Sequence, residues 1–105
     1  MKETPLLLLQ ESALLATTLL KSMSNSNRLL ILCILIDNPG TSSGDLGHLT
    51  GLTPSATSQH LAKMKEDGLI ESERAAQKVK YSIKNDAVKK VISTLKDIYC
   101  PEDFK

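Results

Sequence analysis

The stretch Leu52-Thr53-Pro54-Ser55-Ala56-Thr57-Ser58-Gln59-His60-Leu61-Ala62-Lys63 has the pattern of a helix with one apolar face and one short, polar face. Thr53 is a residue type favoured at the N-cap, and Pro54 follows at the first helical position, where its missing N–H costs nothing. Apolar side chains recur toward one face, at Ala56, Leu61 and Met64. This spacing predicts an amphipathic helix over residues 53–67, and we expect its polar face to be exposed.

The polar face of this helix carries small side chains that donate and accept hydrogen bonds, namely Ser55, Thr57, Ser58, Gln59 and His60. Such residues are poor helix formers, so their concentration on one helix favours a role in recognition. Glutamine pairs with adenine edges, serine and threonine bond to bases or phosphates, and a threonine methyl can contact thymine. We therefore expect these five residues, followed by Lys63, to enter the major groove of DNA. An ordinary helical hairpin with a solvated polar face is the alternative.

A shorter helix is predicted just before this stretch, within Thr41 to Gly51, with Leu46 and Leu49 facing inward. Gly51 suits the left-handed residue that ends a helix. The connection Gly51-Leu52-Thr53 has the length of the turn in a helix-turn-helix, which often contains a glycine. Residues 42–67 are therefore predicted to form a helix-turn-helix.

The residues that follow predict a β-hairpin over residues 69–83. Gly68 ends the helix, and the segments 69–73 and 78–83 then alternate with the period of two that half-buried strands have. The link Arg74-Ala75-Ala76-Gln77 is the predicted hairpin tip. Arg74, Gln77 and Lys78 are expected to lie along the DNA backbone or minor groove, and contacts with phosphates set register and affinity rather than sequence choice.

Three further helices complete the prediction, at residues 6–23, about 25–36 and 86–99. A helix-turn-helix followed directly by a hairpin is a winged helix. The expected fold is therefore mainly α-helical with a β-hairpin wing, an α+β winged helix-turn-helix in the order helix, helix, helix, helix, hairpin, helix. We expect residues 1–105 to form a single DNA-binding domain, a homodimer that pairs through the first and last helices, because these helices carry more apolar surface than one small core can cover.

Length and composition limit the other function classes. The chain has 105 residues and a net charge of +1, so overall basicity does not indicate nucleic-acid binding, although residues 53–84 hold six basic and four acidic residues, a balance of +2. No signal peptide is evident, and the apolar run at residues 6–9 is too short to span a membrane, so the protein is expected to be cytoplasmic, with no membrane partner.

Enzymatic chemistry is not indicated by any motif in the sequence. There is no Gly-rich phosphate loop, no paired carboxylates beyond ordinary surface charge, and no nucleophile-base constellation. Ser58 and His60 are two positions apart on a helix and therefore face different directions. We expect a protein that is not an enzyme and needs no cofactor, and a pure protein-interaction module is the remaining class.

The sequence resembles the ArsR/SmtB family of bacterial winged-helix repressors. The matching segments are residues 27–32, residues 58–64, the run Asp67-Gly68-Leu69-Ile70 and the run Tyr81-Ser82-Ile83. The resemblance covers roughly residues 12–100 and implies that double-stranded operator DNA is the partner. Members of this family commonly respond to metals, but no metal site is expected here, because the third helix has no cysteine and the last helix no histidine.

The two cysteines, Cys33 and Cys100, resemble the pair of a subgroup of this family in which a dithiol responds to reactive sulfur species or oxidants. The resemblance implies that Cys33 and Cys100 form a redox switch and that persulfides, related sulfur species or oxidants are the signal. The residues alone favour the other interpretation, in which Cys33 is a small core side chain and Cys100 a bystander. Two functional alternatives stay open: a metal or other ligand at an unrecognised site, and a redox-insensitive regulator that competes with another DNA-binding protein.

Overall fold

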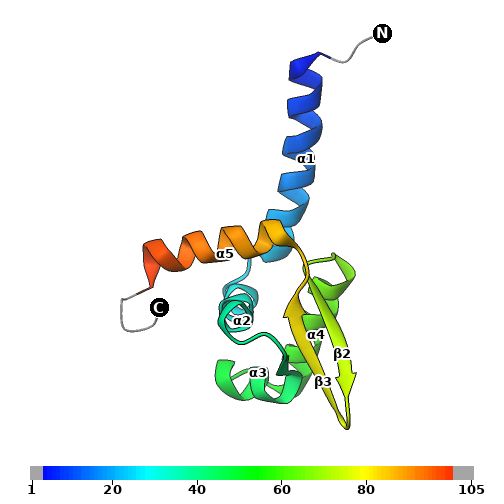
Figure 1. The fold of residues 1–105 in the computed structure, drawn as a ribbon, viewed down its shortest axis with the longest axis vertical. Helices are drawn as coiled ribbons and strands as arrows, with labels where there is room; N and C mark the ends of the chain where they lie inside the picture. The colour runs from blue at the N-terminus through cyan, green and yellow to red at the C-terminus, as the bar shows by residue number, and fades with distance from the viewer. Residues whose placement is uncertain (1–3, 101–105) are drawn as a thin grey trace.

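The computed structural model describes residues 4–100, which form helices and one three-stranded antiparallel sheet (Figure 1). The elements in chain order are α1 (Pro5–Met23), α2 (Ser26–Asp37), β1 (Thr41–Ser42), α3 (Ser43–Thr50), α4 (Pro54–Glu66), β2 (Ile70–Ala75), β3 (Lys78–Ile83) and α5 (Asp86–Tyr99). The predicted winged helix-turn-helix fold is confirmed.

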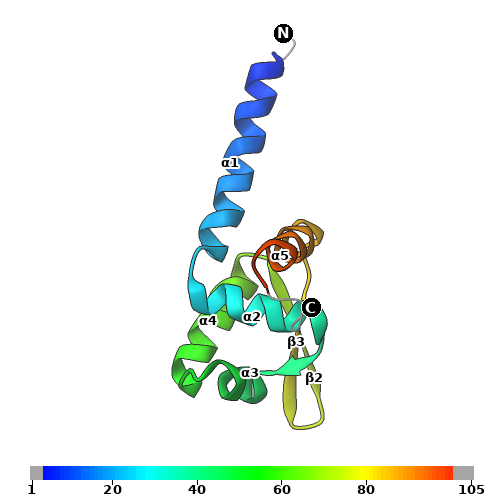
Figure 2. The same cartoon turned by 90° about the vertical axis from the view of Figure 1, so that its left-hand side faces the viewer.

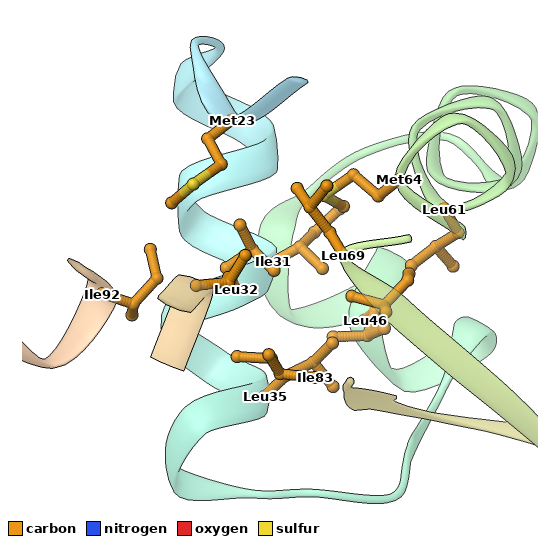
Figure 3. Packing of buried hydrophobic residues seen from close by; sticks show 12 residues of the cluster. Met23, Ile31, Leu32, Leu35, Leu46, Leu61, Met64, Leu69, Ile83 and Ile92 are labelled. Atoms are coloured by element: carbon orange, nitrogen blue, oxygen red, sulfur yellow. The ribbon is translucent and has the colours of Figure 1, made fainter. Parts of the chain in front are cut away.

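The core is built around α2, which lies between α5 on one side and α3 on the other (Figures 1 and 2). Ile31, Leu32 and Leu35 of α2 are almost completely buried. Figure 3 shows these side chains meeting apolar residues from every other helix and from the sheet. Burying an aliphatic side chain of this size contributes about 1.5–3 kcal/mol, so this cluster dominates the stability of the body.

Helix α1 projects away from this body as a long rod (Figures 1 and 2). Only Ser22 and Met23, at its C-terminal end, are buried. Seven leucines along the helix are exposed, namely Leu6, Leu7, Leu8, Leu9, Leu14, Leu15 and Leu20. By length and composition alone α1 could also cross a membrane, but a single such helix near an N-terminus is weak evidence for a span.

The sheet has the order β1-β3-β2 and contains one strand that the sequence did not predict. Thr41 and Ser42 pair with Tyr81 and Lys80 as β1, so the predicted segment of residues 41–51 contains a short strand before the helix, which begins at Ser43. Two residues are too few to display the alternating period of a strand. Ser42 then serves as the N-cap of α3, its hydroxyl accepting from the N–H of Asp45.

The first strand of the hairpin extends further, and its turn is tighter, than predicted. Arg74 pairs with Val79 and Ala75 with Lys78, so β2 extends through Ala75 and only Ala76 and Gln77 form the turn. Ala76 has a positive φ of 57°, a conformation that glycine or asparagine adopts more readily than alanine. The absence of those residues is why the sequence did not indicate a two-residue turn.

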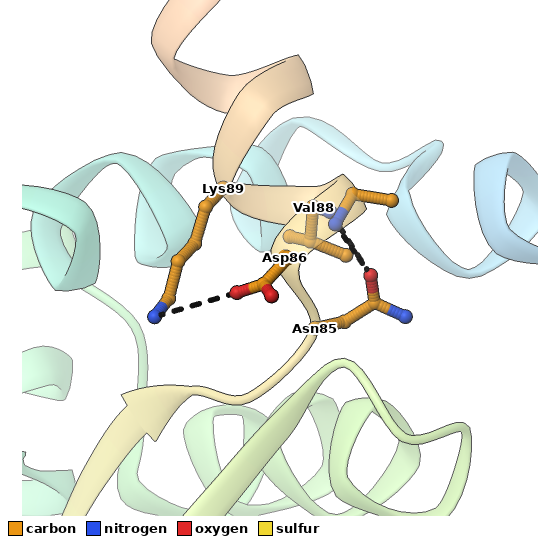
Figure 4. A network of polar contacts seen from close by, with 5 residues as sticks. Asn85, Asp86, Val88 and Lys89 are labelled. Carbon is orange, nitrogen blue, oxygen red and sulfur yellow. Dashed lines mark hydrogen bonds and ion pairs between the residues drawn. The ribbon is translucent and has the colours of Figure 1, made fainter.

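Most helix boundaries agree with the prediction to within one or two residues. Asn25 caps α2 by accepting hydrogen bonds from Asn27 and Arg28. Asn85 caps α5 in the same way, and an ion pair joins Lys89 to Asp86 in the first turn (Figure 4). One inward assignment is wrong: Leu46 is buried in α3, but Leu49 is exposed.

Helices α3 and α4 meet where Gly47 faces Thr57. A Cβ atom on Gly47 would lie 3.0 Å from the hydroxyl oxygen of Thr57 and 3.5 Å from the carbonyl oxygen of Leu52. Thr57 is buried and donates its hydroxyl hydrogen to the carbonyl oxygen of Thr53 at 2.8 Å, so it cannot move away freely. Glycine at position 47 therefore sets how closely the two helices approach.

We predict that Gly47→Ala lowers the free energy of unfolding by about 1–3 kcal/mol, because overpacking at this contact outweighs the gain of up to about 1 kcal/mol that alanine normally brings to a helix. Urea denaturation followed by circular dichroism measures the change. Gly44→Ala is the matched control, since a Cβ there meets nothing within 4 Å. Equal stability of the two variants would contradict the packing argument.

Candidate nucleic-acid interface and cysteine pair

Helix α4 has the polar, exposed face that the sequence predicted. Thr53 caps it by accepting from the N–H of Ala56 at 3.1 Å, and Pro54 occupies its first turn. Leu61 and Met64 are buried against the core. The structure places Ser55, Ser58, Gln59 and Lys63 on the exposed side of the helix.

Thr57 does not lie on this exposed face, although it was expected there. Its side chain is 2% exposed, bonds to the carbonyl oxygen of Thr53 and packs against Gly47. Thr57 shares the spacing of Leu61 and Met64, four and seven residues further on, which places all three on one side of a helix. Thr57 therefore packs α4 against α3.

His60 is half-buried and forms a hydrogen bond with another residue of the protein. Its Nδ1 accepts a hydrogen bond from Nε of Arg28 at 3.1 Å. Arg28 also donates from Nη1 to the carbonyl oxygen of Ser22 at 3.0 Å. Arg28 therefore joins α1, α2 and α4, and no sequence spacing could indicate its contact with His60, which lies 32 residues away in the chain.

A groove runs between α3 and α4 beside this helix, lined in part by His48, Leu52, Pro54 and Ser58. The first turns of both helices, with Ser43 and Pro54, border the groove. Helix N-termini carry unpaired N–H groups and a partial positive charge that suit phosphate. This geometry favours an anionic backbone lying across the helix-turn-helix.

The hairpin presents Arg74, Gln77 and Lys78, all exposed, near its tip. Arg74 lies opposite Val79, whereas Lys78 lies opposite Ala75. Because side chains alternate between the faces of a strand, Arg74 and Lys78 project from opposite faces of the ribbon. A ribbon that carries a cation on each face suits insertion between two negatively charged strands rather than docking flat on one of them.

The second candidate site is formed by Cys33 and Cys100, which lie far apart in the sequence. Cys33 is in α2, and Cys100 follows α5, where its N–H donates to the carbonyl oxygen of Lys96 at 2.9 Å. Both cysteines are half-buried free thiols. Burial raises the pKa of the Cys33 thiol above its ordinary value, and the charge of Cys100 raises it further.

Lys96 is the cation beside this pair. Its side chain is 12% exposed and forms an ion pair with Asp37, which is 54% exposed. The bond to Asp37 is the main cause that raises the pKa of Lys96, and both cysteines contribute. Lys96 in turn lowers the pKa of Cys33, whereas Asp37 raises it.

Sequence spacing could have indicated both charged residues. Lys96 stands four residues before Cys100 and Asp37 four residues after Cys33, so each shares a helix face with its cysteine. Among residues 4–100, no three side chains of His, Cys, Asp or Glu gather as a metal site would require.

Comparisons with known proteins agree with this geometry. Residues 24–71 match the family model described as winged helix-turn-helix DNA-binding. The chain is 59% identical over 98 residues to the HTH-type transcriptional regulator YgaV of Escherichia coli (strain K12), an alignment that covers 93% of this chain and 99% of that protein.

Two further relatives are similar in sequence and structure. The transcriptional activator HlyU of Vibrio cholerae is 41% identical over 92 residues, covering 88% of this chain and 84% of that protein, and the solved structure of reduced HlyU superposes with a TM-score of 0.85 over 89% of this chain and 97% of that one. The solved repressor BigR of Xylella fastidiosa is 26% identical, with a TM-score of 0.81 over 90% of this chain and 95% of that one. The chain belongs to the ArsR/SmtB-like group of winged-helix DNA-binding transcriptional regulators, of the type that includes YgaV, HlyU and BigR.

Proposed function

We propose that this protein is a cytoplasmic, homodimeric repressor that binds double-stranded operator DNA and is released when Cys33 and Cys100 become linked. The link is a bridge of one or more extra sulfur atoms, or a direct disulfide formed by an oxidant. The observation that supports this proposal best is that Cys33 lies in α2 and Cys100 at the end of α5, two helices that pack against each other, and that both thiols raise the pKa of Lys96.

DNA binding is assigned to the exposed residues of α4 and of the hairpin tip. Ser55, Ser58, Gln59 and His60 enter the major groove, with Lys63 at the groove edge. Arg74, Gln77 and Lys78 contact the backbone on either side of the hairpin. Thr57 is left out of this set, because its buried side chain cannot reach DNA without separating α3 from α4.

A second copy of the chain is the proposed occupant of the apolar surface on α1 and α5. Besides the exposed leucines of α1, two apolar side chains at the end of α5, Ile98 and Tyr99, are more than half exposed. A two-fold dimer holds its two copies of α4, the recognition helix proposed to enter DNA, at a fixed separation. Half-sites on DNA repeat about every 34 Å. Pairing through these helices therefore couples the shape of the dimer to operator binding.

The sulfur chemistry follows from the two thiols and a polysulfide. One cysteine thiolate attacks the central sulfur of trisulfane, forms a sulfur–sulfur bond and displaces hydrogen sulfide. The second thiolate then attacks the inner sulfur of that adduct and displaces a second hydrogen sulfide. Two thiols are oxidised to a trisulfide bridge, and the trisulfane is the sulfur source and the oxidant.

Bridge length distinguishes sulfur species from plain oxidants. A direct disulfide requires a Cα separation of about 4.4–6.8 Å, whereas each extra sulfur relaxes that limit. Either bridge ties α2 to α5, and it shifts DNA affinity only if it fits the free conformation better than the bound one. A hundredfold loss of affinity needs about 2.7 kcal/mol of difference between the two conformations.

For the dimer, we predict a sedimenting species of twice the chain mass of 11.5 kDa at micromolar concentration. Leu15→Glu should shift the protein toward monomer and weaken operator binding, because Leu15 is 75% exposed on the apolar surface of α1. Gln10→Glu adds the same charge at a polar position and serves as the control. A monomeric wild type with full operator affinity would refute the proposed dimer.

For DNA contacts, Gln59→Ala should cost about 1–3 kcal/mol of binding free energy and relax the choice at one base position. Lys78→Ala should weaken binding to all DNA sequences alike. It should also reduce the slope of log affinity against log salt concentration by about one. Lys90→Ala, which removes an exposed lysine from α5, is the control for loss of charge. Binding measured across an operator library and several salt concentrations separates these outcomes, and an unchanged affinity in Gln59→Ala would exclude its role.

For the switch, treatment of the reduced protein with a persulfide or polysulfide donor should add whole sulfur atoms, remove two hydrogens and release the DNA. Cys33→Ser and Cys100→Ser should each bind operator but ignore the donor. Intact mass and operator affinity are measured on the same sample. If both single variants respond as the wild type does, the signal acts elsewhere, as in the alternatives of another ligand site or of competition with a second DNA-binding protein.

The charges beside the thiols provide two opposed variants for the same experiment. In a Cys100→Ser background, alkylation of Cys33 should become fast only above the ordinary titration range of a thiol, because burial raises the pKa of Cys33. Lys96→Met removes a charge that lowers this pKa and should move the profile to higher pH. Asp37→Asn removes a charge that raises it and should move the profile to lower pH. Identical profiles would show that neither charge acts on the thiol.

A further inference from the structure

Arg28 occupies a position that the proposed DNA and cysteine sites do not explain. It is the only cationic residue of α2, and its guanidinium is half-buried among three helices. Its Nη1 donates to the carbonyl oxygen of Ser22 in the last turn of α1, at 3.0 Å. That carbonyl end of a helix carries a partial negative charge, so the contact holds the guanidinium in place.

The second bond of Arg28 fixes the chemistry of His60. A guanidinium has only donors, so the Nδ1 that receives the bond from Nε of Arg28 must present a lone pair. The neutral imidazole then carries its hydrogen on Nε2. Within residues 4–100, Nε2 of His60 is neither hydrogen-bonded nor sealed from solvent. His60 follows Gln59 and precedes Lys63 by one turn on the helix proposed to enter DNA.

We propose that Arg28 is a positioning residue that holds the ring of His60 in the tautomer whose Nε2–H donates to an acceptor atom of the bound DNA. The acceptor is an oxygen or an unprotonated nitrogen, such as a purine N7, a carbonyl oxygen of a base or a phosphate oxygen. This inference rests on the proposed docking of α4 in DNA, and it adds a residue on α2 that never touches DNA.

The contact with Arg28 gives His60 a single hydrogen-bonding role. A free neutral histidine can present either a donor or an acceptor, because its hydrogen can occupy either nitrogen. The bond from Arg28 selects the Nε2–H form and holds the ring in one orientation before DNA arrives. DNA that offers an acceptor is then favoured over DNA that offers an amino group, without an ordering cost at the moment of binding.

The first test uses the free protein and needs no DNA. Nitrogen-15 spectra of the imidazole distinguish a protonated ring nitrogen from a bare one. His60 in the neutral form should show only the Nε2–H tautomer in wild type and a mixture in Arg28→Lys, which keeps the charge and a donor for Ser22 but loses the planar Nε–H. A mixture in the wild type would overturn the positioning role.

The second test separates the two nitrogens of His60 by substitution. The shorter amide side chain of His60→Asn can still accept from Arg28 but has no group at the Nε2 position, whereas the longer side chain of His60→Gln reaches that position with an amide donor. Operator affinity should fall about ten- to hundredfold in His60→Asn, as in His60→Ala, and recover in part in His60→Gln. Full affinity in His60→Ala would overturn the contact with DNA.

A double-mutant cycle shows whether Arg28 acts through His60. Arg28→Lys alone should lower operator affinity, but it should add nothing in the His60→Ala background. Additive losses would mean that Arg28 acts by another route and would overturn the proposal. Thermal unfolding of each variant verifies that the fold is kept, and Gln59→Ala reports separately on whether α4 docks in DNA at all.

An operator library identifies the acceptor. Loss confined to one base position in His60→Ala assigns a base edge, and equal loss for every sequence assigns a phosphate oxygen. Both results support the donor role of Nε2.

Discussion

The burial of one side of α2 is the interaction on which the rest of the structure depends. Ile31, Leu32 and Leu35 meet apolar side chains from α3, α4, α5 and the sheet in one continuous cluster (Figure 3). The helix-turn-helix and α5 are held in a fixed relation because α2 lies between them. Truncating one such leucine or isoleucine to alanine typically costs about 2–5 kcal/mol, a large part of the stability of a small protein.

The same helix carries a residue of each candidate site on its remaining surface. Arg28, in its first turn, faces α4, while Cys33 and Asp37, further along, lie beside α5 and its following residue. A helix rises about 1.5 Å per residue, so Arg28 and Cys33 are separated by roughly 7.5 Å along a rigid rod. If the proposed bridge displaced α2 at Cys33, it would therefore also move Arg28, which bonds to His60.

Local signals explain why much of the fold could be predicted from the sequence. Thr53, Pro54 and Asn85 mark helix starts by their hydrogen-bonding chemistry, and Gly51 and Gly68 mark helix ends by their positive φ. The strand β1 was missed because it has two residues and is defined by its partner β3 rather than by its own pattern. The candidate sites also contain features that local signals predict and features that depend on distant parts of the chain. Thr57 was assigned to the exposed face because it is polar, although its spacing from Leu61 placed it with the buried residues. The contact of Arg28 with His60 spans 32 residues of sequence, so only the packing of α2 against α4 creates it.

The small strand β1 has a consequence for how the protein meets a double helix. It pairs with β3, directly precedes α3, and the neighbouring N–H of Gly40 donates to the carbonyl oxygen of Tyr81 at 2.8 Å. The hairpin is thereby tied to the helix-turn-helix by backbone hydrogen bonds and cannot swing independently of it. The distance between the recognition helix α4 and the hairpin tip is therefore fixed. A duplex that met both elements would have to supply the adjustment by bending or changing its groove width, and base pairs that neither element touches would then contribute to the choice of site through their stiffness.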